Sequence, residues 1–392
     1  MRLDKASPTG IALSLLLASF LAPSTFAYKP LSDNFLRQVP AASDTELDPV
    51  TGDLLAPFLQ VRPPDSEGHA DIQDHLVQFF ARELPDWTVE WQNSTTYTSG
   101  KSQKGGKFVA HHRSNLVFRR EPPWTRPGQA NLLTLAAHYA TPVTAPAGYL
   151  GATDAAVSCA LLLHVARSLD KYAAQMYREM QELGEGGTVP MDMGLQIVFI
   201  DSGGLDDKDN TGAESLASTW EKTINPALPA SLYGYPNRLN QISLLLLLDL
   251  LGGASPRVPS RYQTTHWAYQ AMARVEARLR GLKLMDSEST GKFLPDSSSP
   301  VHQLGMASGW ATDGDDHLPF MRRGVTVLPV VPDAKPEHAG TLKDDGKNVD
   351  RKTVRDWSRV LVGFALEWLD MMEVEPAAPA RRRRRVPAAN RA

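Results

Sequence analysis

Residues 132–139, Leu-Leu-Thr-Leu-Ala-Ala-His-Tyr, and residues 151–159, Gly-Ala-Thr-Asp-Ala-Ala-Val-Ser-Cys, decide the fold class of this chain. The first stretch is a short aliphatic run of the kind that forms a buried strand, and it ends near the polar His138. The second stretch opens a helix at a glycine. A buried strand followed by a helix is the unit from which α/β sheets with helices on both faces are built.

The same alternation continues on both sides of this unit. Amphipathic segments at residues 72–84 and 354–372 predict helices. Short aliphatic runs predict four further buried strands, at residues 115–118, 195–201, 242–251 and 325–331. The pattern favours an α/β sheet covered by helices, and the length of 392 residues allows either one such domain or two to three smaller ones.

The composition excludes several classes of protein. With 42% hydrophobic and 22% charged residues, the chain can bury a large core, so it is neither disordered nor collagen-like. Its net charge of −3 gives no excess positive potential for tracking a phosphate backbone, and we expect no nucleic-acid partner. Cys159 is the only cysteine, which excludes an intrachain disulfide and a zinc site built from several thiolates. A metal site must therefore use histidine and carboxylate side chains.

Residues 1–27 have the pattern of a cleaved secretory signal. Arg2 and Lys5 precede an apolar run at residues 10–22, and small residues stand near Ala27, where a signal peptidase would cut. The run is shorter than the ~20 residues that span a bilayer, so we expect a protein that is secreted or in the lumen of the secretory pathway, with no membrane span after cleavage. A retained signal anchor is the alternative. The sequence Asn93-Ser94-Thr95 is an acceptor motif for N-glycosylation, which fits a secretory chain.

The remaining terminal segments lie outside the predicted α/β region. Residues 28–47 form an N-terminal segment that precedes it. Residues 375–392 contain prolines, alanines and the run Arg381–Arg385, without a helical or strand period, and this predicts a disordered, solvated tail. A basic processing site and a contact with an anionic surface are the alternatives for the arginine run.

Polar side chains stand at the ends of the predicted strands. They are His138, Asp154 at the opening of the next helix, Asp201, Asp249, the triplet Asp315-Asp316-His317 and the loop Glu337-His338-Ala339-Gly340. In sheets of this kind the chemistry lies at the carboxyl ends of the strands, where loops converge. Imidazole and carboxylate groups suit zinc, so the pattern indicates a site like that of a metallohydrolase.

At these residues the chain resembles the glutaminyl-peptide cyclotransferase family, secreted single-zinc relatives of the zinc aminopeptidases. The resemblance covers about residues 54–369. It rests on Leu54-Leu-Ala-Pro-Phe-Leu, His138-Tyr139, the stretch 151–159, Ser231-Leu-Tyr-Gly234, Leu247-Leu-Asp249-Leu, Asp315-Asp-His-Leu-Pro-Phe320, Arg322-Arg-Gly-Val325 and Asn348-Val-Asp350. It implies one α/β domain at residues 48–374, with three layers, a mixed central sheet and helices on both faces, as in the zinc aminopeptidases.

The resemblance also implies an activity and a set of site residues. The family converts an N-terminal glutaminyl residue of a peptide or protein to pyroglutamate, with a zinc ion that polarises the side-chain amide and a glutamate that carries the proton. Asp154 matches the first zinc ligand of the family. The Glu and His ligands fall at Gly204 and Gly340, and the proton-carrying glutamate falls at Gly203. Asp249 and Asp315 match an acid network beside the substrate.

Glycine cannot ligate a metal or carry a proton, so we expect zinc to be absent or weakly bound and catalysis to be lost or much reduced. The first alternative is an active cyclotransferase with an unorthodox metal site, in which His338 replaces the lost His and Asp201, Asp206 or Asp207 replaces the lost Glu. The second is a residual metallopeptidase that uses His138, although Ala140 stands where those enzymes need an acid. Without a nearby cation, we expect a raised pKa for Asp249 and a proton shared between Asp249 and Asp315.

Overall fold

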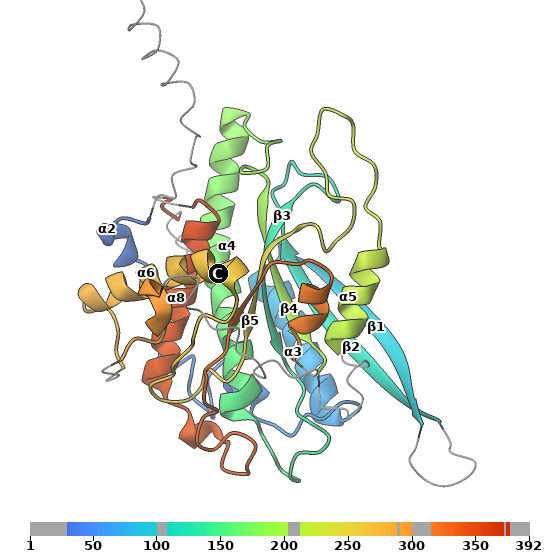
Figure 1. Cartoon of the computed structure of the whole chain (residues 1–392), viewed down its shortest axis with the longest axis vertical. Helices are drawn as coiled ribbons and strands as arrows, with labels where there is room; N and C mark the ends of the chain where they lie inside the picture. Colours follow the sequence, from blue (N-terminus) through green and yellow to red (C-terminus); the bar gives the residue numbers. More distant parts are fainter. Residues whose placement is uncertain are drawn as a thin grey trace, which may run out of the picture.

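The computed structural model describes residues 30–99, 108–202, 212–287, 291–299, 315–371 and 374–376. Within these residues six strands form one mixed sheet in the order β1-β2-β4-β3-β5-β6 (Figure 1). The strands are β1 (Thr88–Ser99), β2 (Phe108–Arg120), β3 (Asn131–His138), β4 (Met193–Ile200), β5 (Ile242–Leu248) and β6 (Val327–Val330). Strand β2 pairs antiparallel with both β1 and β4. The strands β4, β3, β5 and β6 run parallel to one another.

Helices cover both faces of the sheet, so the chain has three layers. One large core contains α3, α4, α6 and α8 together with one side of the strands, and a smaller core contains α5 and α7 with the other side. Figure 1 shows α4 and α8 on one side of the sheet and α5 on the other. The longer helices are α3 (Glu67–Glu83), α4 (Val157–Leu183), α5 (Gly212–Lys222), α6 (His266–Gly281), α7 (Leu318–Arg322) and α8 (Arg351–Trp368). Short helical turns are α2 (Asp33–Leu36), η1 (Ala56–Phe58), η2 (Ala152–Ala156), η3 (Gln263–Thr265), η4 (Pro295–Ser298) and η6 (Gly346–Asn348).

The five strands predicted from aliphatic runs are confirmed as β2 to β6, and the two amphipathic segments are confirmed as α3 and α8. The single-domain α/β fold is confirmed as well. The sequence did not predict β1 or the first half of β2, because this hairpin consists mainly of threonine, serine and other polar residues rather than an aliphatic run. The predicted signal at residues 1–27 and nearly all of the predicted tail at residues 375–392 lie outside the described residues.

Helix α4 is the central helix of the larger core. Together with η2 it forms the segment Ala152–Leu183, which by length and composition alone could cross a membrane. However, 89% of its most apolar window is buried inside the protein, as expected of a core helix. The turn η2 leads directly into α4 and carries Asp154; it follows β3 after a connection at residues 139–151.

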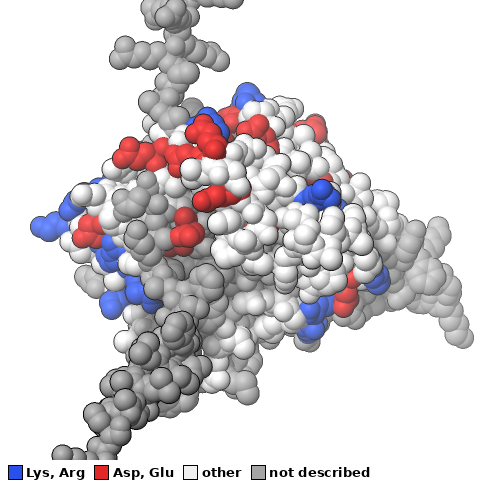
Figure 2. Space-filling view, turned by 90° about the horizontal axis from the view of Figure 1, so that it is seen from above, with Lys and Arg blue, Asp and Glu red and all other residues white. Residues whose placement is uncertain are grey.

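The parallel register brings the carboxyl ends of the central strands to one edge of the sheet. His138 at the end of β3 pairs with Ile200 at the end of β4, and Leu248 at the end of β5 pairs with Val330 at the end of β6. In Figure 1 this edge faces downward, where α4 begins. Figure 2 views the opposite end of the molecule, where side chains of both charges are present and acidic ones gather on one side. The exclusion of nucleic acid, drawn from net charge, stays a prediction.

Buried His164 on α4 should make the protein sensitive to acid. Its Nε2 atom lies 3.4 Å from the Pro40 carbonyl oxygen, and burial lowers the pKa of His164 to about 4. The unfolded chain has a higher histidine pKa, so this group contributes stability above about pH 6.5 that is lost as pH falls toward 4. Between pH 7 and pH 4, the unfolding free energy of the wild-type protein should therefore fall by about 2–3 kcal/mol more than that of the variant His164→Gln. Urea unfolding at pH 7 and at pH 4 tests this, and an identical acid loss in both proteins would contradict it.

Candidate metal centre

Three side chains that can ligate a metal meet at the strand ends. His138 ends β3, Asp154 lies in η2, and Asp249 follows β5 directly. One ligand atom of each lies within 4.8 Å of the others. The Nε2 atom of His138 is 4.0 Å from Asp154 Oδ2, and its Nδ1 atom is 4.0 Å from Asp249 Oδ1. The side chains of His138, Asp154 and Asp249 are 16%, 20% and 27% exposed, respectively. They therefore form a partly enclosed cluster that solvent can still reach.

The electrostatics of this cluster favour a bound cation. Asp249 Oδ1 is buried and accepts no hydrogen bond from any described residue. Burial raises the pKa of Asp249 to about 7; His138 opposes this shift, and Asp154 and Asp316 add to it. Burial disfavours the charged form of His138, but the carboxylates of Asp249 and Asp154 outweigh burial and raise its pKa. An unsatisfied buried acceptor among several carboxylates fits a divalent ion with three protein ligands and an open position.

Asp154 is held in place by a buried assembly at the start of η2. The Thr153 backbone N–H and hydroxyl each donate to Asp344 Oδ1 over 2.7 Å. The Tyr149 hydroxyl lies 3.1 Å from Asp154 Oδ2 and 3.0 Å from Asp344 Oδ2. Gly151 begins this turn with a φ of 58°, and a side chain at this position would also press against the Tyr149 ring. The carboxylate of Asp154 is therefore oriented before any ligand binds.

Arg62 joins the separate loops around this turn. Its guanidinium is fully buried and donates to the carbonyl oxygens of Phe58 at 2.6 Å and of Tyr139 at 2.7 Å. It also donates to the carbonyl oxygens of Leu150 and Gly151. One side chain thus connects η1, the residue after His138 and the turn before Asp154, which fixes two of the three candidate ligands relative to each other.

The cluster opens into a cavity of about 330 Å3 with an acidic lining. The start of α7 adds Asp315 and Asp316 to this lining, and burial, together with the charge of Asp315, raises the pKa of Asp316. His317 is buried beside them, its Nε2 atom lies 2.7 Å from the Tyr262 hydroxyl, and burial lowers its pKa to about 4. The lining residues are His138, Pro142, Asp154, Ser202, Leu247, Asp249, Asp315, Asp316, His317, Val331 and Lys335. Four carboxylates in one cavity suit a metal ion together with a positively charged substrate group.

Comparison with known proteins assigns the chain to a family. The sequence model of Peptidase family M28 matches residues 115–365. The chain is 32% identical to a glutaminyl-peptide cyclotransferase-like protein of Mus musculus over 338 residues, which cover 83% of this chain and 77% of the relative. The chain belongs to peptidase family M28. It is also 29% identical to a glutaminyl-peptide cyclotransferase of Bos taurus, over 87% of each chain, and 32% identical to an uncharacterised protein of Saccharomyces cerevisiae, over 81% and 84%.

Solved structures support the fold of this M28 protein. Macrostomum lignano glutaminyl cyclase superposes with a TM-score of 0.67 at 23% identity, over 89% of this chain and 96% of that one. A Zn-dependent exopeptidase from Parabacteroides distasonis superposes with a TM-score of 0.52 at 17% identity, over 83% and 98%. These superpositions show the fold, whereas the resemblance to glutaminyl-peptide cyclotransferases is confirmed by the sequence relatives.

The structure places the expected carboxylates of this M28 protein in one cavity. Asp154, Asp249 and Asp315 all line the acidic cavity. The raised pKa of Asp249 agrees with the sequence prediction. The expected sharing of a proton between Asp249 and Asp315 stays a prediction; the charges that act most on Asp249 are those of His138, Asp154 and Asp316. The charge of Asp315 acts on Asp316, Arg261 and Tyr262.

The predicted substitute ligand His338 does not reach Asp154. His338 lines a neighbouring cavity of about 530 Å3, with Thr153, Leu250 and Pro336 among the other lining residues. The same loop approaches Asp154 through its backbone, because the Gly340 N–H donates to the Tyr149 hydroxyl over 3.3 Å. The φ of Gly340 is +80°, a conformation that residues with a side chain rarely adopt. The lost ligand position therefore has a backbone that now suits glycine.

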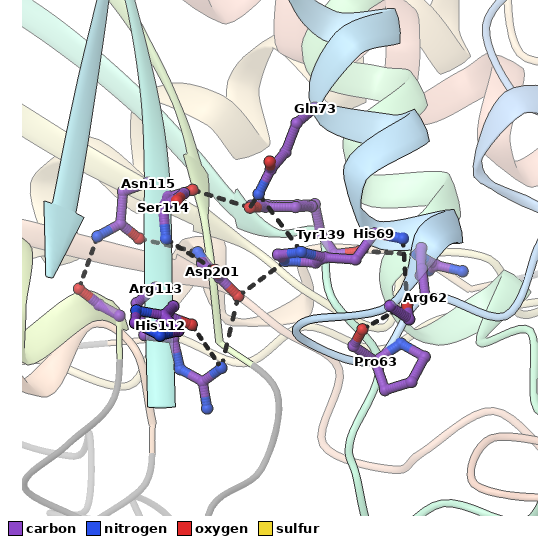
Figure 3. A network of polar contacts seen from close by, with 12 residues as sticks. Arg62, Pro63, His69, Gln73, His112, Arg113, Ser114, Asn115, Tyr139 and Asp201 are labelled. Carbon is purple, nitrogen blue, oxygen red and sulfur yellow. Dashed lines mark hydrogen bonds and ion pairs between the residues drawn. The ribbon is translucent and has the colours of Figure 1, made fainter. Parts of the chain in front are cut away.

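Asp201, the other expected substitute that the structure describes, is part of a buried network with residues of α3 and β2 (Figure 3). Its carboxylate is fully buried, lies 3.1 Å from His69 Nε2 and accepts the Ser114 N–H over 2.8 Å. Arg113 lies 4.0 Å from the same carboxylate, and the Asp201 N–H donates to Asn115 Oδ1. The other expected substitutes, Asp206 and Asp207, and the lost positions Gly203 and Gly204 lie outside the described residues.

Sequence reasoning underrated His138 and missed its supports. The signal for His138 was present, because a histidine ended a buried strand beside two acidic strand ends. Ala140 stands where an acid is expected, yet Asp249 brings an acid close to His138 from a neighbouring strand. Nothing local in the sequence indicated Arg62, Tyr149 or Asp344, whose partners are distant in the chain.

Proposed function

We propose that this chain is a secreted glutaminyl-cyclase-type protein that binds one divalent metal ion and the free N-terminus of peptides, with much reduced turnover to pyroglutamate. The observation that carries the proposal is the grouping of His138, Asp154 and Asp249 at the mouth of an acidic cavity. Secretion rests on the signal-like residues 1–27.

The metal would be held by His138, Asp154 and Asp249, in place of the ligand set that the resemblance implies. A zinc ion with three protein ligands supplies Lewis-acid polarisation of a substrate carbonyl. The chain's own residues do the rest of the binding. Tyr149 orients Asp154, and the carboxylates of Asp315 and Asp316 attract the ammonium group of a peptide N-terminus.

Reduced turnover follows from what the site lacks. Pyroglutamate formation needs a group that takes a proton from the α-amino group and returns it to the leaving ammonia. The matching position is Gly203, which has no side chain for this task. Loss of a general acid and base lowers turnover by about 100-fold to 10,000-fold. Binding of the peptide N-terminus depends on other residues and should persist.

A second function is favoured by a separate observation. His138 takes part in the ligand cluster, and the family to which the chain belongs is a peptidase family. A metal ion at this site could also activate a water molecule for hydrolysis of an N-terminal peptide bond. The residual metallopeptidase is therefore the alternative proposal, and it predicts release of a free N-terminal amino acid.

Peptide binding and turnover can be separated by experiment. In the presence of zinc, a peptide with a free N-terminal glutamine should bind, and its N-acetylated form should not, as measured by calorimetry. The kcat/KM for pyroglutamate formation should lie at least about 100-fold below that of an active mammalian relative assayed in parallel. Turnover equal to that of the relative would contradict the proposed loss of catalysis. Equal binding of the acetylated peptide would contradict recognition of the N-terminus, and release of free glutamine would favour the peptidase.

A further inference from the structure

The hairpin of β1 and β2 carries the N-glycosylation motif Asn93-Ser94-Thr95 on its outer strand. Strand β1 stands at the edge of the sheet and pairs with β2 alone among the described strands. Residues alternate between its two faces. The Gln92 amide donates to the hydroxyls of Ser215 and Thr219 on α5, so the face of Gln92 is the one covered by that helix. Asn93 therefore lies on the other face.

That other face is exposed around Asn93. The side chains of Val89 and Trp91 are 47% and 42% exposed, and Asn93 and Thr95 are exposed too. The amide of Asn93 forms no hydrogen bond with any described residue, so a substituent on it breaks no hydrogen bond. Trp91 and Asn93 are same-face neighbours, about 7 Å apart along the strand. An exposed aromatic ring thus lies within reach of any group attached to Asn93.

An exposed apolar strip on an edge strand is a risk for a protein. The free backbone groups of such a strand can pair with another chain, and apolar side chains strengthen that pairing. Natural proteins protect these edges with charges, prolines, bulges or a covering group. Neither a charge nor a proline stands among Val89, Trp91, Asn93 and Thr95 on this face. A bulky, polar group on Asn93 would provide the missing protection.

We propose that Asn93 carries an N-linked glycan and that its first sugar rings pack over Trp91. The proposal rests on the entry into the secretory pathway that is part of the proposed function. In the reaction, the Asn93 amide nitrogen forms a bond to the anomeric carbon of an oligosaccharide. The bond from that carbon to a polyprenyl diphosphate breaks, the amide loses one proton, and the polyprenyl diphosphate leaves. The co-reactant is thus a polyprenyl-diphosphate-linked oligosaccharide of the secretory pathway.

Occupancy of the site is tested with three variants of the full chain. The chain is expressed behind an appended cleavable signal peptide in a eukaryotic secreting cell, so that entry into the pathway does not depend on its own residues 1–27. The wild-type protein and the matched control Ser94→Ala, which keeps the motif, should migrate more slowly on a gel until N-glycosidase treatment. Asn93→Gln and Thr95→Ala should lack this shift. Secreted wild-type protein without the shift would overturn the proposal. Expression with the native N-terminus tests secretion separately.

The contact between the glycan and Trp91 has its own readout. Acrylamide quenching of tryptophan fluorescence should increase when N-glycosidase removes the glycan from the folded wild-type protein. In Trp91→Phe the same treatment should leave the quenching unchanged, because the affected ring is absent. Equal quenching of the glycosylated and deglycosylated wild-type protein would overturn the packing of the sugar over Trp91.

Discussion

Replacing His138 with alanine should lower zinc affinity by at least about 100-fold, whereas replacing His338 with alanine should leave it unchanged. His138 is one of three donors whose ligand atoms lie within 4.8 Å of one another. Removing any one ligand from a site with three protein ligands removes most of its affinity for the metal. His338 lies in the same region of the structure but lines a different cavity, which makes it a matched control.

Competition with a chromophoric chelator measures both affinities, and the visible spectrum of bound Co2+ reports the donor set without reference to activity. Circular dichroism and thermal unfolding establish that each variant folds. A His338→Ala variant that loses the metal while His138→Ala retains it would overturn the proposed centre in favour of a shifted loop. Tight zinc binding in both variants would place the metal elsewhere.

Replacing Asp201 with asparagine should lower the free energy of unfolding by about 3 kcal/mol and leave zinc affinity unchanged. The carboxylate is fully buried, and it contacts His69 and the Ser114 N–H at 3.1 and 2.8 Å. The side-chain amide of asparagine is neutral, so His69 and Arg113 no longer face a negative charge. Its NH2 group is a donor, and it points toward either His69 or the Ser114 N–H, both of which need an acceptor. Removing one charge of a buried ion pair is costly, because the other charged group stays buried without its partner.

The control for this variant is Asp333→Asn. Asp333 pairs with Arg257 at 3.3 Å, but its side chain is 42% exposed, so its removal should change stability by less than about 1 kcal/mol. Urea unfolding at neutral pH compares the two variants. If Asp201→Asn loses zinc without loss of stability, Asp201 is a ligand, as one of the sequence-based alternatives has it. If both variants are equally stable, the network around Asp201 contributes little.

The paired tests distinguish residues that resemble each other in sequence. His138 and His338 are both histidines near the end of a predicted strand, and Asp201 and Asp249 are both acids at the end of a buried strand. A sequence argument based on spacing treats such residues alike. Their roles differ because β3 and β5 are neighbours and bring His138 and Asp249 together, whereas β2 and α3 surround Asp201 with donors.

Hydrophobic patterning is a local property, and for that reason the sequence by itself determined the second half of β2, the buried strands β3 to β6, the helices α3 and α8, and the edge of the sheet at which polar residues gather. It did not predict β1, whose polar residues are held in the strand by pairing with β2. Only the tertiary structure decided which polar groups meet. His138 joins Asp154 and Asp249 because Arg62 and Asp344 fix loops that are far apart in the chain. The direction of a side chain depends on such long-range hydrogen bonds, and they leave no periodic signal in the sequence.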